Sequence, residues 1–537
     1  MIPLLLFASV ITGPEPIGNR VIDLTPPVSR PDTPRCVVTL FERREFAGET
    51  PLPIAYRPPA ECPGPWRKVV LEADFDVTAG TQFDRTADLT LGGATLFVGT
   101  TMEPDAHYAP HWHVERDVTD VAAVLRHPAE GVAALANFID KDHDGRVFWR
   151  ARLVFYGGKQ AEPYRVVLPV TGGLTRLDAQ QPTFNRTLDL PRNLIRLEMD
   201  LFAIGQERDE FWYDCVPPGF AAPNPFAPTA CAAPHREVEV RIDDQLAGIH
   251  AVQPVIFTGG INPSLWRRAP DLHALNLPSA RLDLTPFAGL LNDGKPHRIT
   301  LTMPGVGNSF RVSATLIGEV DPTRAVVPGA VIANRLAPAS VTTRQIQPGR
   351  RADLTGTLLT TAERSGYVEG YIRTSRGRVT TRVAYALDAQ LTSVRDTGKS
   401  DKRYEARQSM TVTNRGRKPS RHHIDEHDSL AIAIHVDPPL YGVKYGTQII
   451  HTSERMTLGE GERDSSQTLV LKTFAPSSSV FSAPRSQPNP VSAMSLSRHP
   501  GQPCQRTEAT LEDDLVTQSA DTACLVPPLQ TPGHPPF

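Results

Sequence analysis

Four short segments of the sequence bring carboxylic acids close to aromatic rings and arginine. They are residues 82–85 (QFDR), 100–104 (TTMEP), 112–119 (WHVERDVT) and 209–213 (DEFWY). Two carboxyl groups can divide the roles of general base and general acid when their surroundings separate their pKa values. Aromatic rings add flat apolar faces that a ligand can pack on. The combination therefore indicates a candidate site for acid–base chemistry.

Each of these segments also has a purely structural interpretation. An adjacent pair such as Asp84 and Arg85 is usually an ion pair at or near the surface. Trp212 and Tyr213 are residue types that usually belong to the core when they lie on a strand. Asp117 can simply accept the backbone N–H of Thr119 in a turn. Spacing alone leaves both interpretations open.

Two polar motifs resemble metal sites. Residues 140–145 (DKDHDG) copy the first half of a calcium loop, but Ala151 stands where the bidentate acid belongs. An Asp-Gly turn that joins residues 133–139 and 147–156 as a hairpin explains this motif better. We therefore expect no calcium site there.

Histidine clusters are the other candidate metal ligands. His107, His111 and His113 lack an acidic or cysteine fourth ligand at a recognisable spacing. Residues 422–427 (HHIDEH) are expected to form a solvated loop. The chain also lacks the G-x-S-x-G, HExxH, P-loop and dinucleotide-binding motifs. We predict neither a metal nor a cofactor.

The composition excludes several classes of protein. With 56 Lys and Arg against 59 Asp and Glu, the net charge of -3 gives no electrostatic basis for binding nucleic acid or an anionic membrane. Hydrophobic residues make up 40% of the chain, enough to build cores, and no apolar run approaches the roughly 18–20 residues of a membrane helix. The 51 Pro and 38 Gly disfavour long helices and favour short strands joined by turns.

The N-terminus and the cysteines both indicate export. Residues 1–10 (MIPLLLFASV) are similar to the apolar region of a secretory signal, although a basic flank is missing and a buried first strand is the alternative. Six cysteines permit fifteen pairings, or six unrelated thiols, and none has a zinc spacing. Their order along the chain favours Cys36–Cys62, Cys215–Cys231 and Cys504–Cys524. We expect a secreted or periplasmic protein, and a monomer.

Strand patterns run through most of the chain. Residues 69–77, 87–98, 147–156, 378–387 and 408–413 are β-branched, aromatic or alternating, and Gly, Pro or Asp-Gly bounds many of them. The fold class is therefore all-β. The expected divisions are a signal-like leader (1–35), a first β domain (36–215), a Pro-rich linker (216–234), a second β domain (235–328), a C-terminal β region (329–475), and a Ser/Pro linker with a disulfide tail (476–537).

A short sequence pattern that occurs twice, which we call the internal echo, suggests that two of these domains have similar folds. Residues 117–125 (DVTDVAAVL) and 283–291 (DLTPFAGLL) each place a polar turn before a short apolar run. Such an echo fits two similar antiparallel sandwiches side by side. Chance similarity is the alternative for so short a motif.

The acidic and aromatic segments also resemble, in order along the chain, those of the glycoamidase A family. These are peptide-N4-(N-acetyl-β-glucosaminyl)asparagine amidases of plants, fungi and some bacteria. The resemblance covers roughly residues 36–470, and the Cys504/Cys524 couple is similar to a feature of the family. Its further motifs are Cys62-Pro63, Trp66, Asn137, Phe155-Tyr156, residues 236–238, Asp243, residues 257–263, Trp266 and residues 283–287. The resemblance implies hydrolysis of the amide that joins asparagine to the first N-acetylglucosamine of N-glycosylated peptides or proteins.

A fainter resemblance to the flavobacterial glycoamidase implies two adjacent eight-stranded jelly rolls. It also implies that Asp84 is the main catalytic residue and that Glu210 assists it. The third helper acid of that enzyme falls near residues 137–140, where no Glu stands. Residues expected to contact substrate are Arg85, Glu103, Trp112, Glu115, Asp117, Asp209, Trp212 and Tyr213. The rival hypotheses are a two-carboxylate glycosidase and a non-catalytic glycan-binding β-sandwich.

Overall fold

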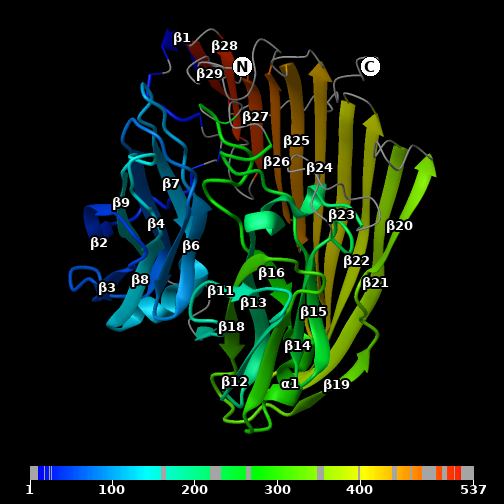
Figure 1. The fold of residues 1–537 in the computed structure, drawn as a ribbon. Helices are drawn as coiled ribbons and strands as arrows, with labels where there is room; N and C mark the ends of the chain where they lie inside the picture. The colour runs from blue at the N-terminus through cyan, green and yellow to red at the C-terminus, as the bar shows by residue number, and fades with distance from the viewer. Residues whose placement is uncertain are drawn as a thin grey trace, which may run out of the picture.

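The structure, a computed structural model of the chain, is built almost entirely of antiparallel strands (Figure 1). It describes residues 10–16, 18–22, 25, 27–158, 165–217, 231–261, 266, 268–347, 356–396, 399–437, 444–459, 462–474, 491–498, 505–512 and 515–521. Within these ranges no helix is long and apolar enough to cross a membrane. The all-β prediction is confirmed.

The first sandwich consists of two four-stranded sheets whose inner faces share one core. Trp149 is fully buried there and stacks on Phe75, with ring centroids 4.8 Å apart. One sheet has the order β2 (Arg35–Phe46), β9 (Val147–Gly157), β4 (Trp66–Val77), β7 (His111–Asp117). The other has the order β3 (Leu52–Tyr56), β8 (Ala129–Leu135), β5 (Thr86–Leu91), β6 (Ala94–Thr100).

The second sandwich repeats this arrangement. One sheet has the order β10 (Arg165–Pro169), β18 (Ser309–Val320), β13 (Leu194–Gln206), β16 (Ala280–Asp283), with β11 (Thr175–Leu177) added beside β18. The other has the order β12 (Thr183–Leu188), β17 (His297–Thr302), β14 (Glu237–Ile242), β15 (Gln245–Ala251). With β11 set aside, both sandwiches have sheets ordered first–eighth–third–sixth and second–seventh–fourth–fifth, which is the jelly-roll topology.

The chain divides between the sandwiches earlier than the sequence suggested. The expected first domain ran to residue 215, whereas residues 165–206 pair with β16–β18 in the second sandwich. In sequence, the Pro-rich stretch of residues 216–234 therefore falls between β13 and β14, two strands of the second sandwich, and does not separate the two sandwiches. Its composition resembles that of a linker because it is a long connection, and composition does not reveal which strands it joins.

The internal echo has a structural counterpart. A 3₁₀ segment, η1 (Thr119–Arg126), follows β7, and a similar turn, η5 (Thr285–Phe287) leading into α1 (Ala288–Leu291), follows β16. Asp117 accepts the Thr119 amide at 3.0 Å, and Asp283 accepts the Thr285 amide at 2.9 Å. These turns occupy the same place after the sixth strand of each jelly roll.

The third layer is a large sheet of long strands. Its order runs from β1 (Val10–Pro16) through β29 (Leu515–Asp521), β28 (Gln505–Glu512), β27 (Val491–Arg498), β26 (Glu462–Phe474), β25 (Lys444–Gly459), β24 (Ser420–Asp437), β23 (Lys399–Arg415), β22 (Gly377–Asp396) and β21 (Gly356–Thr374) to β19 (Gly329–Asn334), with β20 (Ser340–Gln347) also on β21. Part of the expected leader thus pairs with the C-terminal end of the chain.

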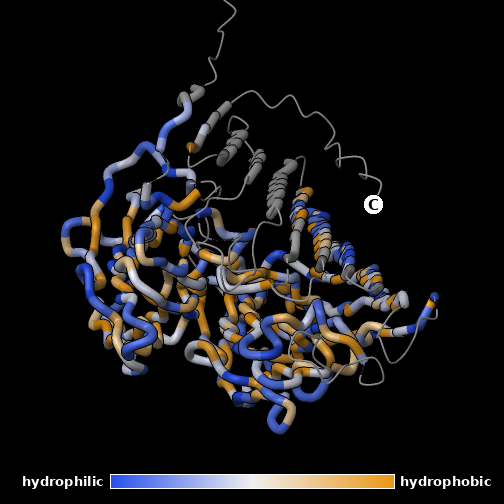
Figure 2. The backbone as a smooth tube through the Cα atoms, turned by 45° about the horizontal axis from the view of Figure 1, so that its top comes forward, coloured by the Kyte–Doolittle hydropathy of each residue, from blue (hydrophilic) through white to orange (hydrophobic). Residues whose placement is uncertain are grey.

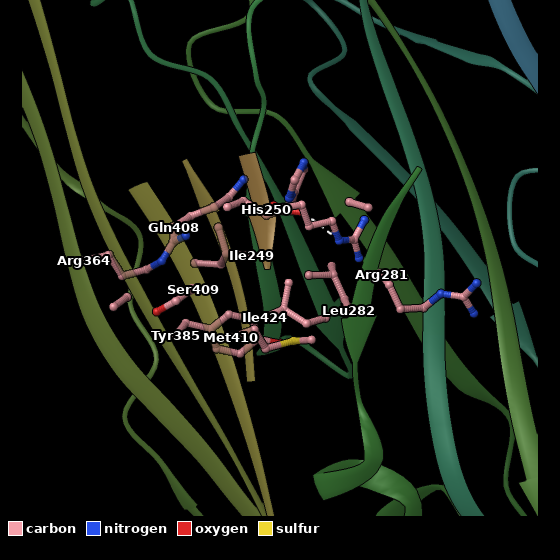
Figure 3. Close-up of a pocket in the computed structure, with 14 residues that line it drawn as sticks. Ile249, His250, Arg281, Leu282, Arg364, Tyr385, Gln408, Ser409, Met410 and Ile424 are labelled. Atoms are coloured by element: carbon pink, nitrogen blue, oxygen red, sulfur yellow. Dashed lines mark ion pairs between the residues drawn. The ribbon is translucent and has the colours of Figure 1, made fainter. Parts of the chain in front are cut away.

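One face of this sheet packs on the second sandwich. Tyr385, Tyr404 and Leu430 join the core that contains Leu282 and Phe287. Figure 2 shows hydrophobic and hydrophilic residues alternating along its strands, as a sheet with one covered face requires. A small cavity of about 30 Å³ lies at this junction. Figure 3 shows Arg364 on its sheet side and Leu282 on its sandwich side.

Several local expectations are corrected. Residues 133–139 and 147–156 do not form a hairpin, because β8 and β9 belong to opposite sheets. The Asp144 carboxylate instead accepts the Thr81 amide at 2.8 Å, which ties the crossing loop to a neighbouring loop. Residues 422–427 lie inside β24 and are not a loop. The expected linker within 476–503 contains β27.

Two predicted disulfides are confirmed. Cys36 pairs with Cys62, and Cys215 pairs with Cys231. The first ties β2 to the loop that follows β3. The predicted Cys504–Cys524 pair lies outside the described residues.

Candidate active site

Two carboxylates meet at the backbone of Gly259. Asp84 lies in the loop between β4 and β5, and Glu103 follows β6, so both come from the first sandwich. Gly259 follows β15 of the second sandwich. A Cβ atom at Gly259 would lie 2.7 Å from Glu103 Oε1 and 3.0 Å from Asp84 Oδ1. Only glycine leaves room for both oxygens, so the two carboxylates lie side by side at the junction of the sandwiches.

Glu210 is the third carboxyl group of this cluster. It lies in η2 (Glu207–Asp214), the short helical segment that follows β13. Burial, together with the negative charges of Asp84 and Glu103, raises the pKa of Glu210 to about 8. Both Asp84 and Glu210 are half-buried, so neither is sealed from solvent. The structure therefore brings together the two residues predicted to be catalytic.

Asp84 has a different electrostatic setting from Glu210. Burial raises its pKa to about 6, but the Arg85 charge and hydrogen bonds from the backbone amides of Asp84 and Gly259 oppose that rise. At neutral pH the surroundings thus favour an ionised Asp84 and a protonated Glu210. The cluster thus contains both a potential base, Asp84, and a potential acid, Glu210, as general acid–base chemistry requires.

The loop that carries Asp84 is fixed by its neighbours. The Gln82 side-chain amide donates to the carbonyl oxygens of Phe138, at 2.9 Å, and Gly145, at 3.3 Å. The Arg85 amide donates to Thr101 Oγ1 at 2.9 Å, and the Thr258 hydroxyl donates to the Thr101 carbonyl at 2.9 Å. Loops from both sandwiches are therefore joined around Asp84.

Exposed aromatic rings lie beside the carboxylates. The Phe83 and Phe138 side chains are 52% and 48% exposed, which is unusual for phenylalanine. The Phe83 ring lies 5.0 Å from the His143 ring, and the Arg85 guanidinium lies 5.9 Å from the Phe138 ring. We call Phe83 and Phe138 the phenyl pair; they can offer apolar faces to a ligand.

Three predicted residues of the 209–213 segment support Glu210 rather than face solvent. Asp209 accepts the backbone amides of Gly307, at 3.0 Å, and Ser309, at 2.9 Å, and pairs with buried Arg236. Trp212 is buried edge-on against Tyr404 of the large sheet, 5.9 Å between centroids. The Tyr213 hydroxyl is buried, and the charge of Glu210 helps to raise its pKa.

Three other predicted contact residues are held in structural roles elsewhere. Trp112 is buried and stacks on Phe75 at 5.1 Å between ring centroids. Glu115 accepts the Val28 amide at 2.8 Å and pairs with Arg30, so it fixes the N-terminal segment. Asp117 caps its turn, as one interpretation of the sequence foresaw. These contacts are made with Phe75, the N-terminal segment and Thr119, and not with the clustered carboxyl groups.

The polar motifs weighed as metal sites form local bonds. Asp140 accepts the backbone amides of Asp142 and His143, both at 2.8 Å, as in an Asx turn. His113 bonds to Asp74 at 2.7 Å. Among the residues that the structure describes, no group of three His, Cys, Asp or Glu side chains is arranged to hold a metal ion.

Sequence reasoning missed Gly259 and Phe138 and undervalued Glu103. Gly259 lies within a family motif, but its part in the site depends on a close approach between two sandwiches. Phe138 precedes a highly polar loop (IDKDHDG), and a lone aromatic residue there is the one local signal that it is exposed.

Comparison with protein families gives a match over residues 25–328. The matching family is described as peptide N-acetyl-beta-D-glucosaminyl asparaginase amidase A. A peptide-N4-(N-acetyl-beta-glucosaminyl)asparagine amidase A from Prunus dulcis is 29% identical over 388 residues. The aligned part covers 67% of this chain and 66% of that relative, so the chain spans about two thirds of its length.

Solved structures with similar folds are more distant. A peptide-N(4)-(N-acetyl-beta-D-glucosaminyl)asparagine amidase is 12% identical, with a TM-score of 0.37, over 55% of this chain and 98% of its own. PNGase F from Flavobacterium meningosepticum is 12% identical with a TM-score of 0.35, over 53% and 96% of the two chains. PNGF-II is 13% identical with a TM-score of 0.38, over 53% and 66%.

Proposed function

Since the chain belongs to the peptide N-acetyl-beta-D-glucosaminyl asparaginase amidase A family, we propose that it hydrolyses the side-chain amide between asparagine and the proximal N-acetylglucosamine of N-glycosylated peptides or proteins. The products are aspartate and a glycosylamine, which then loses ammonia. The observation that carries the proposal is the meeting of Asp84, Glu103 and Glu210 at the junction of the two jelly rolls.

Asp84 acts as the general base. Its carboxylate takes a proton from water as the water oxygen attacks the amide carbonyl carbon. Arg85 and two backbone amides favour the ionised form that this step needs. The half-buried position keeps the carboxylate open to water and substrate while limiting competing solvent.

Glu210 acts as the acid. Its carboxyl group is protonated at neutral pH and can donate to the amide, which stabilises negative charge on the carbonyl oxygen and helps the nitrogen to leave. The C–N bond breaks as the nitrogen gains a proton, and the water oxygen remains on the new aspartate. Glu103 assists by keeping Glu210 protonated through its negative charge. It would take the place of the third acid, since residues 137–140 contain no Glu.

The surrounding side chains would hold the substrate. Arg85 offers donors to sugar hydroxyls, and the phenyl pair offers apolar faces to the glycan or to the peptide beside the asparagine. Because the phenyl pair is exposed and Phe83 and Arg85 flank Asp84 in the sequence, these residues would act in binding more than in bond cleavage.

Mass spectrometry of one purified N-glycopeptide tests the proposal. Incubation in heavy-oxygen water should convert the glycosylated asparagine to aspartate that carries one heavy oxygen, also when EDTA is present. A peptide that keeps asparagine with one sugar attached would identify a glycosidase instead. A glycopeptide that binds but stays intact would identify a glycan-binding protein. Loss of activity with EDTA, restored by zinc or calcium, would contradict the metal-free reaction.

We further infer that the protein is exported and works as a monomer without a nucleic-acid partner. The two disulfides support an oxidising compartment such as the periplasm or the cell exterior. The near-balance of charges supports the absence of a nucleic-acid partner. Thiol labelling of protein recovered from its natural compartment and light scattering of the purified chain test these inferences.

A further inference from the structure

The large sheet lies beyond the residues that match the family, yet it touches both segments that the second sandwich contributes to the site. The family match ends at residue 328, and β21–β25 follow it. Tyr404 of β23 packs against Trp212 of η2, and Lys402 of the same strand pairs with Asp214. The segment that carries Glu210 therefore rests on this sheet.

The second segment consists of the described residues 252–261, 266 and 268–279 between β15 and β16, which we call the Gly259 loop. Its Gly259 amide donates to the Asp84 carboxylate. Within the loop, buried Trp266 donates to the Gly260 carbonyl at 2.7 Å, and the Ala274 carbonyl accepts the Thr100 amide at 2.8 Å. The shape of this loop thus decides where the Gly259 amide points.

A buried ion pair fastens the Gly259 loop to the large sheet. Nδ1 of His451 on β25 lies 2.8 Å from Oδ2 of Asp271, and their side chains are 1% and 0% exposed. The same Asp271 oxygen accepts the Ile256 amide at 3.2 Å, three residues before Gly259. His451 therefore holds the carboxylate that closes the base of the loop.

Other groups around this pair make it part of one electrostatic cluster. The charge of Asp428 on β24 acts on His451, and the charge of His451 acts on His273. Asp271 and Glu210 both act on the Tyr213 phenol, whose hydroxyl has no partner among the described residues. Tyr213 therefore lies within electrostatic reach of both the ion pair and the candidate acid.

We propose that His451 is a positioning residue for the carboxylate site: by holding Asp271 it fixes the Gly259 loop, so that the large sheet completes a site built by the two jelly rolls. The catalytic part of this inference rests on the proposed amidase function, whereas the structural part does not. Removing the Nδ1 donor of His451 would leave the buried Asp271 oxygen without this hydrogen-bond partner, and the loop would shift to hydrate the carboxylate. A small displacement of the Gly259 amide would then misplace Asp84.

Two substitutions of similar polarity separate this role from general stability. In His451→Asn the amide nitrogen occupies the place of Nδ1 and can still donate to Asp271. In His451→Gln it falls near the place of Nε2 and cannot. Tyr385→Phe is the matched control, because it removes a hydroxyl of the same sheet that donates to the Asp283 carbonyl on β16 and not to the Gly259 loop.

Hydrogen exchange and steady-state kinetics on the full chain test the proposal. In His451→Gln, amide exchange should speed up in residues 252–261 and 268–279, and kcat should fall about tenfold with KM nearly unchanged. His451→Asn should keep both properties close to wild type. Tyr385→Phe should lower the melting temperature without changing exchange in this loop. Should His451→Gln fail to fold, Asp271→Ala, which removes the oxygen that accepts from both His451 and the Ile256 amide, should loosen the same loop.

Wild-type exchange and kcat in His451→Gln would overturn the proposal. Equal losses in the Asn and Gln variants would also overturn it, because the bond to Asp271 would then not be what matters. If the wild-type chain cleaves no glycopeptide, the proposed function fails, and the exchange data alone still decide whether His451 fixes the loop.

Discussion

The charge of Asp84 in the first sandwich raises the pKa of Glu210, which the second sandwich supplies. Neither sandwich alone contains both carboxyl groups, so the acid–base pair exists because the two jelly rolls pack together. The two sandwiches approach each other closely at Gly259. A side chain at this position would push the Asp84 and Glu103 carboxylates away.

Asp84→Asn should abolish most of the activity. The amide keeps the shape of the side chain but cannot take a proton, so kcat should fall by about a thousandfold. Asp88→Asn is the matched control, because Asp88 is another buried acid of the first sandwich whose pKa burial raises to about 6. Glycopeptide cleavage near full rate by folded Asp84→Asn protein would remove Asp84 from its assigned role.

The pH profile of kcat/KM should be bell-shaped. Activity should fall below about pH 6 as Asp84 gains a proton and above about pH 8 as Glu210 loses one. Glu103→Gln removes a negative charge that favours protonated Glu210, so the alkaline limb should move to lower pH, with kcat reduced about tenfold. Rates measured from pH 4 to 10 in constant ionic strength check this. A limb that stays in place would show that Glu103 does not act on Glu210.

Glu210→Gln should stabilise the fold in alkaline solution. The pKa of Glu210 is higher in the folded chain than in the unfolded chain, so ionisation costs folding free energy as pH rises from about 4.5 to about 8. The amide of Glu210→Gln does not ionise, so the variant is not destabilised as the pH rises. Its melting temperature should match wild type at pH 4 and exceed it by several degrees at pH 9. An equal difference at both pH values would point to packing instead of charge.

Truncating the phenyl pair should weaken binding more than chemistry. Phe83→Ala with Phe138→Ala removes two exposed rings beside Asp84, so KM for glycopeptide should rise about fivefold while kcat changes little. Ile332→Ala is the control, because Ile332 is 49% exposed on β19, away from the site. An unchanged KM in the double variant would show that the rings do not touch substrate.

The sequence by itself determined the family and the fold class, and it singled out the carboxylates that we propose as base and acid. The ordered motifs indicated the family that the later match confirms. Runs of β-branched and aromatic residues bounded by Gly, Pro or Asp-Gly marked strands such as β4 and β9 within one to three residues, because such residues favour extended backbone. Two disulfides were also predicted correctly from the order of the cysteines.

Local patterns failed where a strand had more than one available partner. Asp144-Gly145 has the composition of a hairpin turn, but the strands on either side pair within opposite sheets. Residues 165–206 have strand patterns that fit either sandwich. Alternation shows that a strand has a buried face, but it does not say which sheet covers that face.

Only the tertiary structure decided which residues form the site. It placed Glu103 against Asp84 and brought the Gly259 loop between them, while it assigned Trp112, Glu115 and Asp117 to packing, anchoring and capping. The physical reason is that carboxyl groups acquire opposed protonation states from burial and from neighbouring charges. In this protein those neighbours come from two sandwiches, and a buried histidine far along the chain fastens the loop between them.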